Sequence, residues 1–104
     1  MIIYFVFDDI SLAFGIVRNE SKTFWRHTTP SKMTLTWITQ QIRHHLKLYN
    51  YANTTIIFAG SQKCIEQILK SPKVVTLLGA RSVKTIITSY GGRNGFNEAV
   101  SKSF

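Results

Sequence analysis

The chain has 104 residues, of which 44% are hydrophobic and 12% aromatic, so it can bury one core but not two stable domains. Its 13 Lys and Arg against 5 Asp and Glu give a formal net charge of +8, which favours nucleic acid as a partner and an acidic protein surface as the second choice. No run of about 18 apolar residues could span a bilayer and no basic amphipathic helix stands out, so no membrane partner is expected. The single Cys64 excludes an internal disulfide and predicts a cytoplasmic or nuclear, intracellular protein.

The first part of the chain predicts three strands. Residues 2–7 are β-branched and aromatic, which suits a strand buried on both faces at the centre of a sheet. Residues 11–18 continue the apolar pattern, and a turn at 19–21 leads into a third extended segment at 22–27. Because the connections are this short, we expect the three strands to form an antiparallel meander.

The middle of the chain predicts a helix, a strand and a second helix. Ser31 can cap a helix that runs to Tyr49. The apolar stripe of this helix consists of Leu35, Ile38, Ile42 and Leu46. Residues 54–59 form a short apolar strand, after which Ser61 caps a second helix that ends at Pro72. The inner face of the second helix consists of Cys64, Ile65, Ile68 and Leu69.

The last part of the chain predicts one more strand and one more helix. Residues 74–78 are ambiguous between a strand and a continued helix, and residues 83–88 have the pattern of a strand. A glycine-rich turn at 91–95 leads to a short helix from about Asn97. The order β-β-β-α-β-α-β-α predicts an α/β fold over residues 1–104, with a mixed five-stranded sheet, the first strand at its centre and helices on its faces.

Three segments carry motifs in the order and approximate spacing of one known family. Residues 7–11 have the sequence Phe-Asp-Asp-Ile-Ser, residues 56–62 Ile-Ile-Phe-Ala-Gly-Ser-Gln, and residues 91–98 Gly-Gly-Arg-Asn-Gly-Phe-Asn-Glu. These segments resemble the Asp-Gly-Ser strand end, the Thr-Asp-Ser-Gln junction and the Gly-His-x-Gly loop before an Asn-Glu-x-Ala-Asp helix of type 1 ribonuclease H. The resemblance implies a ribonuclease H-like fold.

Family catalysis, as this resemblance implies it, needs four carboxylates that hold two magnesium ions about 4 Å apart. Only the first position carries over, onto Asp9 with Asp8 beside it. The other positions fall near Trp37 or Ile38, at Gly60 and near Ser101. None of these can supply a charged oxygen ligand, so we expect no catalysis, no metal and no cofactor. Asp8 and Asp9 are then vestigial residues that either cap a strand-end turn or keep some metal affinity.

Histidine and cysteine, which often bind metals, have simpler interpretations here. His44 and His45 are adjacent on a predicted helix, so their side chains point about 100° apart, which argues against a shared metal. His45 is expected to cover part of the core and His44 to be solvated. Cys64 lies on the inner face of its helix, where a packed thiol is more common than a nucleophile.

Basic residues are spread along the chain in three local groups. These are Arg18, Lys22 and Arg26; Arg43 and Lys47; and Arg81, Lys84 and Arg93. The first group lies on the second and third predicted strands, beside aromatic residues. In a ribonuclease H-like fold, that sheet edge is near the surface on which a duplex would rest.

The surplus of positive charge therefore predicts a nucleic-acid-binding surface. The residues expected to contact phosphates are Arg18, Lys22, Arg26, Arg43, Lys84 and Arg93. Trp25 is expected to be part of the same surface as an aromatic neighbour. The residues expected to reach sugar hydroxyls are Ser11, Asn94 and Asn97. Such contacts would recognise the shape of RNA or of an RNA–DNA hybrid duplex with little base specificity. The alternative is that these charges only solvate the surface.

Three functions follow from these features. The first is a non-catalytic nucleic-acid-binding protein, a degenerate relative of ribonuclease H. The second is a protein-interaction module, such as a small viral or mobile-element factor that binds or inhibits a host protein, with Trp25 and Trp37 as candidate anchors. The third is a metal-dependent nuclease with a rearranged site.

Overall fold

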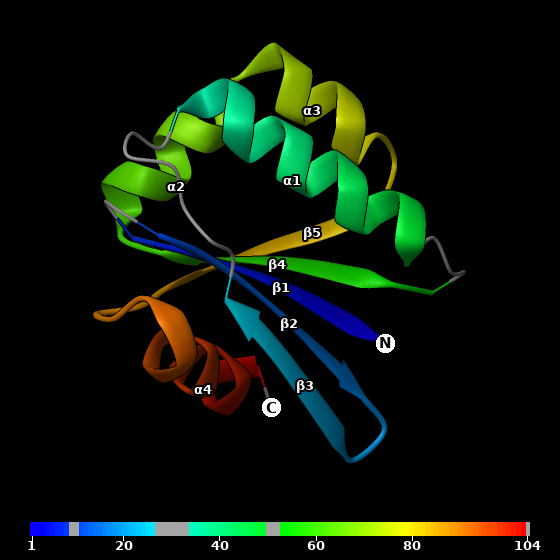
Figure 1. Ribbon diagram of the computed structural model, residues 1–104, viewed down its shortest axis with the longest axis vertical. Helices are drawn as coiled ribbons and strands as arrows, with labels where there is room; N and C mark the ends of the chain where they lie inside the picture. Colours follow the sequence, from blue (N-terminus) through cyan, green and yellow to red (C-terminus); the bar gives the residue numbers. More distant parts are fainter. Residues whose placement is uncertain (9–10, 27–33, 50–52, 104) are drawn as a thin grey trace.

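The computed structural model of this protein describes residues 1–8, 11–26, 34–49 and 53–103 (Figure 1). Within these ranges the chain forms one β-sheet with helices packed against it. The strands are β1 (Ile2–Phe7), β2 (Leu12–Arg18), β3 (Ser21–Arg26), β4 (Thr55–Gly60) and β5 (Ser82–Ile87). The helices are α1 (Leu35–Leu48), α2 (Gln62–Leu69), α3 (Pro72–Leu78) and α4 (Gly92–Ser103).

β1 is the central strand of a five-stranded mixed sheet with the order β3-β2-β1-β4-β5. It pairs antiparallel with β2 and parallel with β4, while β3 and β5 form the two edges. The side chains of Ile3, Tyr4, Phe5 and Val6 all have an exposed fraction of 0%. The predicted α/β class, the mixed sheet and the central position of the first strand are therefore confirmed.

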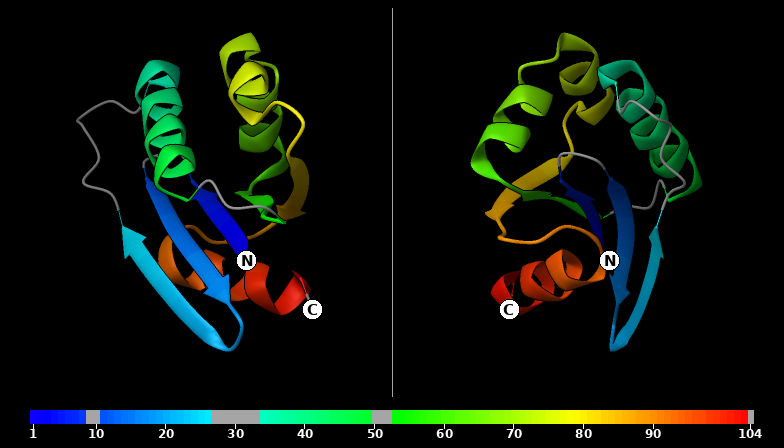
Figure 2. Two further views of the ribbon diagram at one scale, coloured as in Figure 1. Left: turned by 90° about the vertical axis from the view of Figure 1, so that its right-hand side faces the viewer. Right: turned by 60° about the vertical axis from the view of Figure 1, so that its left-hand side comes forward.

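Helices cover both faces of this sheet, which explains why β1 is apolar at every position. α1, α2 and α3 lie on one face and α4 on the other (Figures 1 and 2). Side chains alternate along a strand, so Ile3, Phe5 and Phe7 pack under α1–α3, whereas Tyr4 and Val6 pack under α4. We call these two sides the three-helix face and the α4 face.

The three-helix face is built around aromatic rings. Phe14 of β2 stacks on His45 of α1, with ring centroids 3.7 Å apart and ring planes 9° from parallel. Phe5 contacts Phe14 at 5.4 Å and Phe58 at 5.5 Å between centroids. His45 is only 7% exposed, so its predicted role in covering the core is confirmed.

The α4 face depends instead on a close approach between α4 and the sheet. The ring of Phe96 lies directly over Gly15, where any β-carbon would collide with the ring. Phe96 also meets Tyr4 edge to face, with centroids 5.4 Å apart and planes at 86°. The missing side chain of Gly15 therefore sets how near α4 lies to β1 and β2.

The starts of α1 and α2 test the predicted caps. α1 begins at Leu35, later than predicted, and Thr34 caps it by accepting a hydrogen bond from the Trp37 amide at 3.2 Å. Ser31, the predicted cap, lies outside the described residues. α2 starts as predicted, because the Ser61 hydroxyl accepts a hydrogen bond from the amide of the third helical residue at 3.2 Å.

The ambiguous residues 74–78 belong to a separate helix, α3, which changes the element order to β-β-β-α-β-α-α-β-α. Pro72 follows the end of α2, as predicted, but it also opens α3. The first turn of a helix makes no use of an amide proton, so proline is favoured there. Gly79 ends α3 with a positive φ of 57°.

α4 begins at Gly92 rather than at about Asn97. The glycines at 91–95 favoured a turn because glycine destabilises a helix interior by about 1 kcal/mol relative to alanine. Their small size allows close packing instead, since a β-carbon on Gly95 would lie 2.8 Å from Cγ1 of Val6 on β1. Tertiary contact here overrides the local preference.

Candidate functional site

Asp8 lies directly after β1, at the end of the sheet where the parallel strands β1, β4 and β5 finish. We call this end the carboxyl edge. Asp8 accepts at its Oδ1 a hydrogen bond from the Ser11 amide at 2.6 Å, and its own amide donates to the Ser11 carbonyl oxygen at 3.0 Å. These bonds tie together the two ends of the turn from β1 to β2, so the predicted turn-capping role of Asp8 is confirmed. Asp9 lies outside the described residues. Gly91, just before α4, packs directly against the Asp8 carboxylate.

The other positions at which the family resemblance implies carboxylates are apolar, small or exposed. Ile38 is 6% exposed within the core, and Trp37 packs against the same core. Gly60 ends β4, where a β-carbon would lie 2.7 Å from the Phe7 carbonyl oxygen. Ser101 is exposed near the end of α4. Among the residues that the structure describes, no three His, Cys, Asp or Glu side chains form a group that could hold a metal ion.

A cavity of about 430 Å³ opens beside Asp8, between α1 and α2. It is lined by Asp8, Leu35, Ile38, Lys63, Cys64, Gln67 and Ile68. We call it the carboxyl-edge cavity. The prediction of a packed Cys64 is only partly right, because the thiol is partly buried and also lines this cavity. The cavity itself was not predicted, since it depends on how α1 and α2 are placed over the sheet.

The first predicted basic group is divided between the two faces of the sheet. Arg18 pairs with Ser21, and Lys22 pairs with Val17 of the α4-face core. Adjacent strand positions face opposite sides, so Lys22 is on the α4 face and Arg18 on the three-helix face. Arg26 ends β3, but its side chain lies outside the described part of the structure.

The hairpin that carries Arg18 and Lys22 also lies far from Asp8. Val17 pairs with Ile2 at the start of β1, whereas Asp8 follows the end of that strand. A strand rises about 3.3 Å per residue, so roughly 20 Å separates the two ends. These basic residues therefore lie near the start of β1, at the opposite end of the sheet from the carboxyl edge.

Lys22 and Arg93 are both on the α4 face, near Phe24. Phe24 follows Lys22 by two strand positions and packs on Phe96 of α4, with centroids 5.4 Å apart. The Arg93 guanidinium carbon lies 4.7 Å from the centre of the Phe24 ring, which is a cation–π contact. Lys22 and Arg93 therefore lie on the same face of the sheet, and Arg93 is held there by Phe24.

The remaining predicted contacts lie apart from this pair. Lys84 is on β5, at the opposite edge of the sheet from β3. Trp25, which is 41% exposed, faces the three-helix side, where its ring lies 5.5 Å from that of Phe14. Ser11 lies at the carboxyl edge, bonded to Asp8. The two exposed α4 asparagines of the prediction are Asn94 and Asn97. The ten predicted residues therefore do not form one continuous surface.

A groove between α1 and α3 instead collects basic residues from two of the predicted groups. Its volume is about 440 Å³, and it is lined by Arg43, Leu46, Lys47, Leu77 and Arg81. Arg81 donates a hydrogen bond to the Leu77 carbonyl oxygen at 2.9 Å, which holds its guanidinium at the carboxyl end of α3. Arg43 and Lys47 lie one turn apart on α1 and are exposed. We call this the basic groove.

Neither helix of the basic groove contains an acidic residue: α1 has the sequence LTWITQQIRHHLKL and α3 the sequence PKVVTLL. These two helices therefore contribute no carboxylate to the groove. The sequence grouped Arg81 with Lys84 and Arg93 because they are near one another in the chain, but Arg81 belongs with Arg43 and Lys47. The spacing of Arg43 and Lys47 on a helix without acids was the signal available beforehand.

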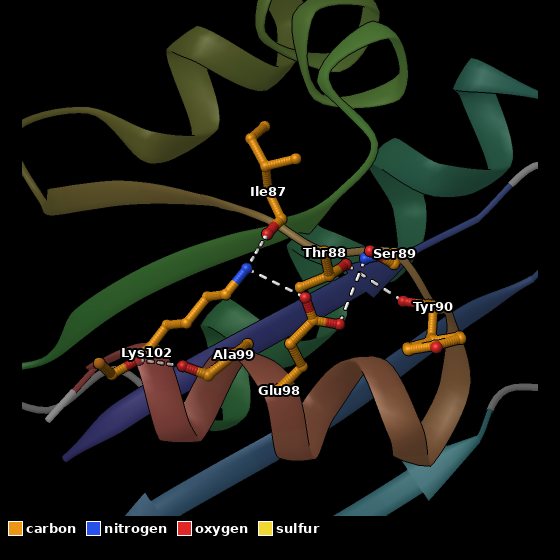
Figure 3. Close-up of polar contacts among 8 residues, drawn as sticks. Ile87, Thr88, Ser89, Tyr90, Glu98, Ala99 and Lys102 are labelled. Carbon is orange, nitrogen blue, oxygen red and sulfur yellow. Dashed lines mark hydrogen bonds and ion pairs between the residues drawn. The ribbon is translucent and has the colours of Figure 1, made fainter.

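Glu98, the acid in the third family-like segment, holds the loop between β5 and α4 (Figure 3). Its Oε1 accepts a hydrogen bond from Lys102 Nζ at 3.0 Å, and its Oε2 accepts one from the Ser89 amide at 3.2 Å. Lys102 also donates to the Ile87 carbonyl oxygen at 2.9 Å. The hydrogen bond from Lys102, assisted by the Ser89 amide, holds the pKa of Glu98 below its ordinary value. This carboxylate therefore has a structural role.

No protein-family model matches the sequence, and no curated protein matches it. In the part of the chain that the structure describes, no helix has the length and apolar character needed to cross a membrane. The candidate binding sites on the three-helix face are the basic groove and the carboxyl-edge cavity.

Proposed function

We propose that this protein binds nucleic acid without cleaving it, and that the basic groove holds the phosphate backbone. The observation that carries this proposal is the convergence of Arg43, Lys47 and Arg81 on one groove whose two helices contain no carboxylate. Phosphates are the regularly repeated anions that several cations in a row can contact together. The net charge of +8 adds long-range attraction to any such polymer.

The scaffold supports the same proposal. The strand order β3-β2-β1-β4-β5, with α4 alone on one face, is compatible with the ribonuclease H-like fold that the sequence resembles. Ile38 is part of the core, and a side chain at Gly60 would meet the Phe7 carbonyl oxygen. Both observations favour a protein that keeps this architecture without the carboxylates of the enzyme. On this resemblance we propose RNA, or an RNA–DNA hybrid, as the preferred polymer.

A gel-shift series tests the binding. The protein is titrated against single-stranded RNA, duplex RNA, an RNA–DNA hybrid and duplex DNA of equal length, each with and without Mg²⁺ or Mn²⁺. We expect the RNA-containing duplexes to bind most tightly and to remain uncut. Metal-dependent cleavage that disappears in Asp9→Asn would overturn the non-catalytic part, and no shift with any polymer would overturn the whole proposal.

A second experiment tests the basic groove. Three phosphate contacts give a slope of about −2.7 for log K against log salt, or about 40-fold in affinity between 50 and 200 mM salt. The triple variant Arg43→Gln/Lys47→Gln/Arg81→Gln should lose that part of the slope. Circular dichroism should accompany the assay, because Arg81 also caps α3.

The matched control is Arg18→Gln/Lys22→Gln/Arg93→Gln. It removes the same charge from residues outside the groove, so it should weaken binding less and keep most of the salt slope. If both triple variants lose the same slope, the groove is not the principal site and binding is spread over the surface.

A protein partner is the second candidate, favoured by a different groove. An opening of about 550 Å³ between α2 and β5 is bordered by Ile65, Leu69 and Ile87, and Ile87 is 50% exposed. Exposed apolar side chains at a sheet edge are common in protein interfaces. A stoichiometric protein that stays bound after nuclease treatment, combined with no gel shift, would favour this function over nucleic-acid binding.

A further inference from the structure

We infer that the carboxyl-edge cavity holds one unpaired nucleobase of the bound polymer. This inference rests on the proposed nucleic-acid binding and adds a second point of contact to the basic groove. The cavity lies where β1 ends, between an antiparallel and a parallel neighbour. In open α/β sheets, ligands bind outside the carboxyl ends of the strands, at the point where chain connections diverge.

The size and the walls of the cavity suit a flat ring. Its volume of about 430 Å³ is within the range of sites for small molecules. Ile38 and Ile68 are 6% and 3% exposed, so these two walls belong to the core, whereas Leu35, which also lines the cavity, is 43% exposed. Aliphatic walls can cover the faces of a base and leave its edges to polar groups.

Three polar side chains at the cavity match the edge of a base. The Asp8 carboxylate accepts hydrogen bonds, the Lys63 ammonium donates them and the Gln67 amide does both. Asp8 is held in place by the Ser11 amide at 2.6 Å. A phosphate in the same cavity would face the Asp8 carboxylate, so the observations favour a base over the backbone.

The position of the cavity along α1 connects it to the basic groove. Leu35 begins α1, and Arg43 lies eight residues later. At 1.5 Å per residue this is about 12 Å. Stacked nucleotides rise about 3.4 Å each, so a strand whose phosphates lie in the groove reaches the cavity within about four nucleotides. The fitting ligand is therefore a duplex with a short single-stranded end.

Cys64 provides a direct measure of occupancy, because it is the only cysteine of the chain and it lines the cavity. The rate at which this thiol reacts with 5,5′-dithiobis(2-nitrobenzoic acid) is followed with three ligands of equal duplex length. One is blunt, one has a four-nucleotide overhang, and one has an overhang of equal length without bases. At a ligand concentration of ten times Kd the cavity is about nine-tenths occupied, so the normal overhang should slow the reaction about tenfold. The blunt and baseless ligands should leave the rate nearly unchanged.

Equal protection by the baseless overhang would overturn the inference, since it would show that the backbone covers the thiol. Gel shifts with every ligand but no change in the Cys64 rate would also overturn it, while leaving the proposed function intact. No gel shift with any ligand would overturn the proposed function itself. In a matched pair of variants, Gln67→Ala should reduce the affinity gained from the overhang. Gln62→Ala, on the same helix but outside the cavity lining, should not.

Discussion

The two faces of the sheet are held by opposite kinds of packing. On the three-helix face, the rings of Phe14, His45 and Phe5 fill the core, and side chains from α1, α2 and α3 cover it. On the α4 face, one helix comes close because Gly15 leaves room for the Phe96 ring. Hollows form where several helices meet, so the cavity and the groove both lie on the three-helix face. The three-helix face therefore depends on large aromatic side chains that fill its core, whereas the α4 face depends on the missing side chain of Gly15.

Phe14 and Gly15 are neighbours on β2 that face opposite sides, so they test this difference directly. Phe14→Ala should remove the ring on which His45 stacks and lower the free energy of unfolding by about 4 kcal/mol, as for other buried phenylalanines. Urea denaturation followed by far-UV circular dichroism measures the loss. Phe14→Leu is the control, and a loss as large as that of alanine would mean that volume is not the cause.

Gly15→Ala should destabilise the protein by the reverse mechanism, through added volume. A single methyl group would enter the Phe96 ring, and overpacking of this kind costs about 2 kcal/mol. The same substitution in a Phe96→Leu background should cost clearly less, because the smaller side chain can yield. Equal losses in the two backgrounds would mean that the Phe96 ring does not limit the space at Gly15.

A smaller effect is expected at the helix caps of the three-helix face. Ser61→Ala removes the hydroxyl that accepts from the Cys64 amide and should cost about 1 kcal/mol. Ser61→Asp keeps a capping oxygen and should retain most of the stability. If both variants lose the same amount, the serine hydroxyl contributes through something other than the cap.

The smallest effect concerns Glu98 on the α4 face. The hydrogen bond from Lys102 lowers the pKa of Glu98 in the folded state below its ordinary 4.5. A lowered pKa stabilises the fold above the ordinary value, and this contribution is lost as the pH falls through the lowered pKa. Glu98→Gln should therefore lower the urea midpoint slightly at neutral pH, and the difference from wild type should shrink below pH 4.5. A difference that stays constant with pH would contradict the role of the charge.

The sheet could be predicted from sequence because its strands carry local signals. β1 is apolar along its whole length, and the turns around β2 and β3 are short, so both the buried position and the meander follow. The start of α4 could not be predicted in this way. The glycines at 91–95 have a local preference for a turn, and the close approaches of Gly95 to Val6 and of Gly91 to Asp8 exist only in the folded chain.

The candidate sites were harder to predict than the fold. The basic groove joins Arg43 and Lys47 to Arg81, and this meeting requires α3, whose residues 74–78 have no clear local preference. Sequence proximity placed Arg81 with Lys84 instead. The carboxyl-edge cavity likewise depends on the space between two helices, for which no local pattern exists.

The edge position of β5 has a consequence for self-association. Among the described strands, β5 pairs on one side only, with β4, and Ile87 at its end is 50% exposed. An open edge of this kind can recruit the same edge of another copy and start aggregation. Lys84 stands in the middle of β5 and is exposed, so two such edges would bring like charges together. Lys84 therefore opposes edge-to-edge pairing between the β5 strands of two copies.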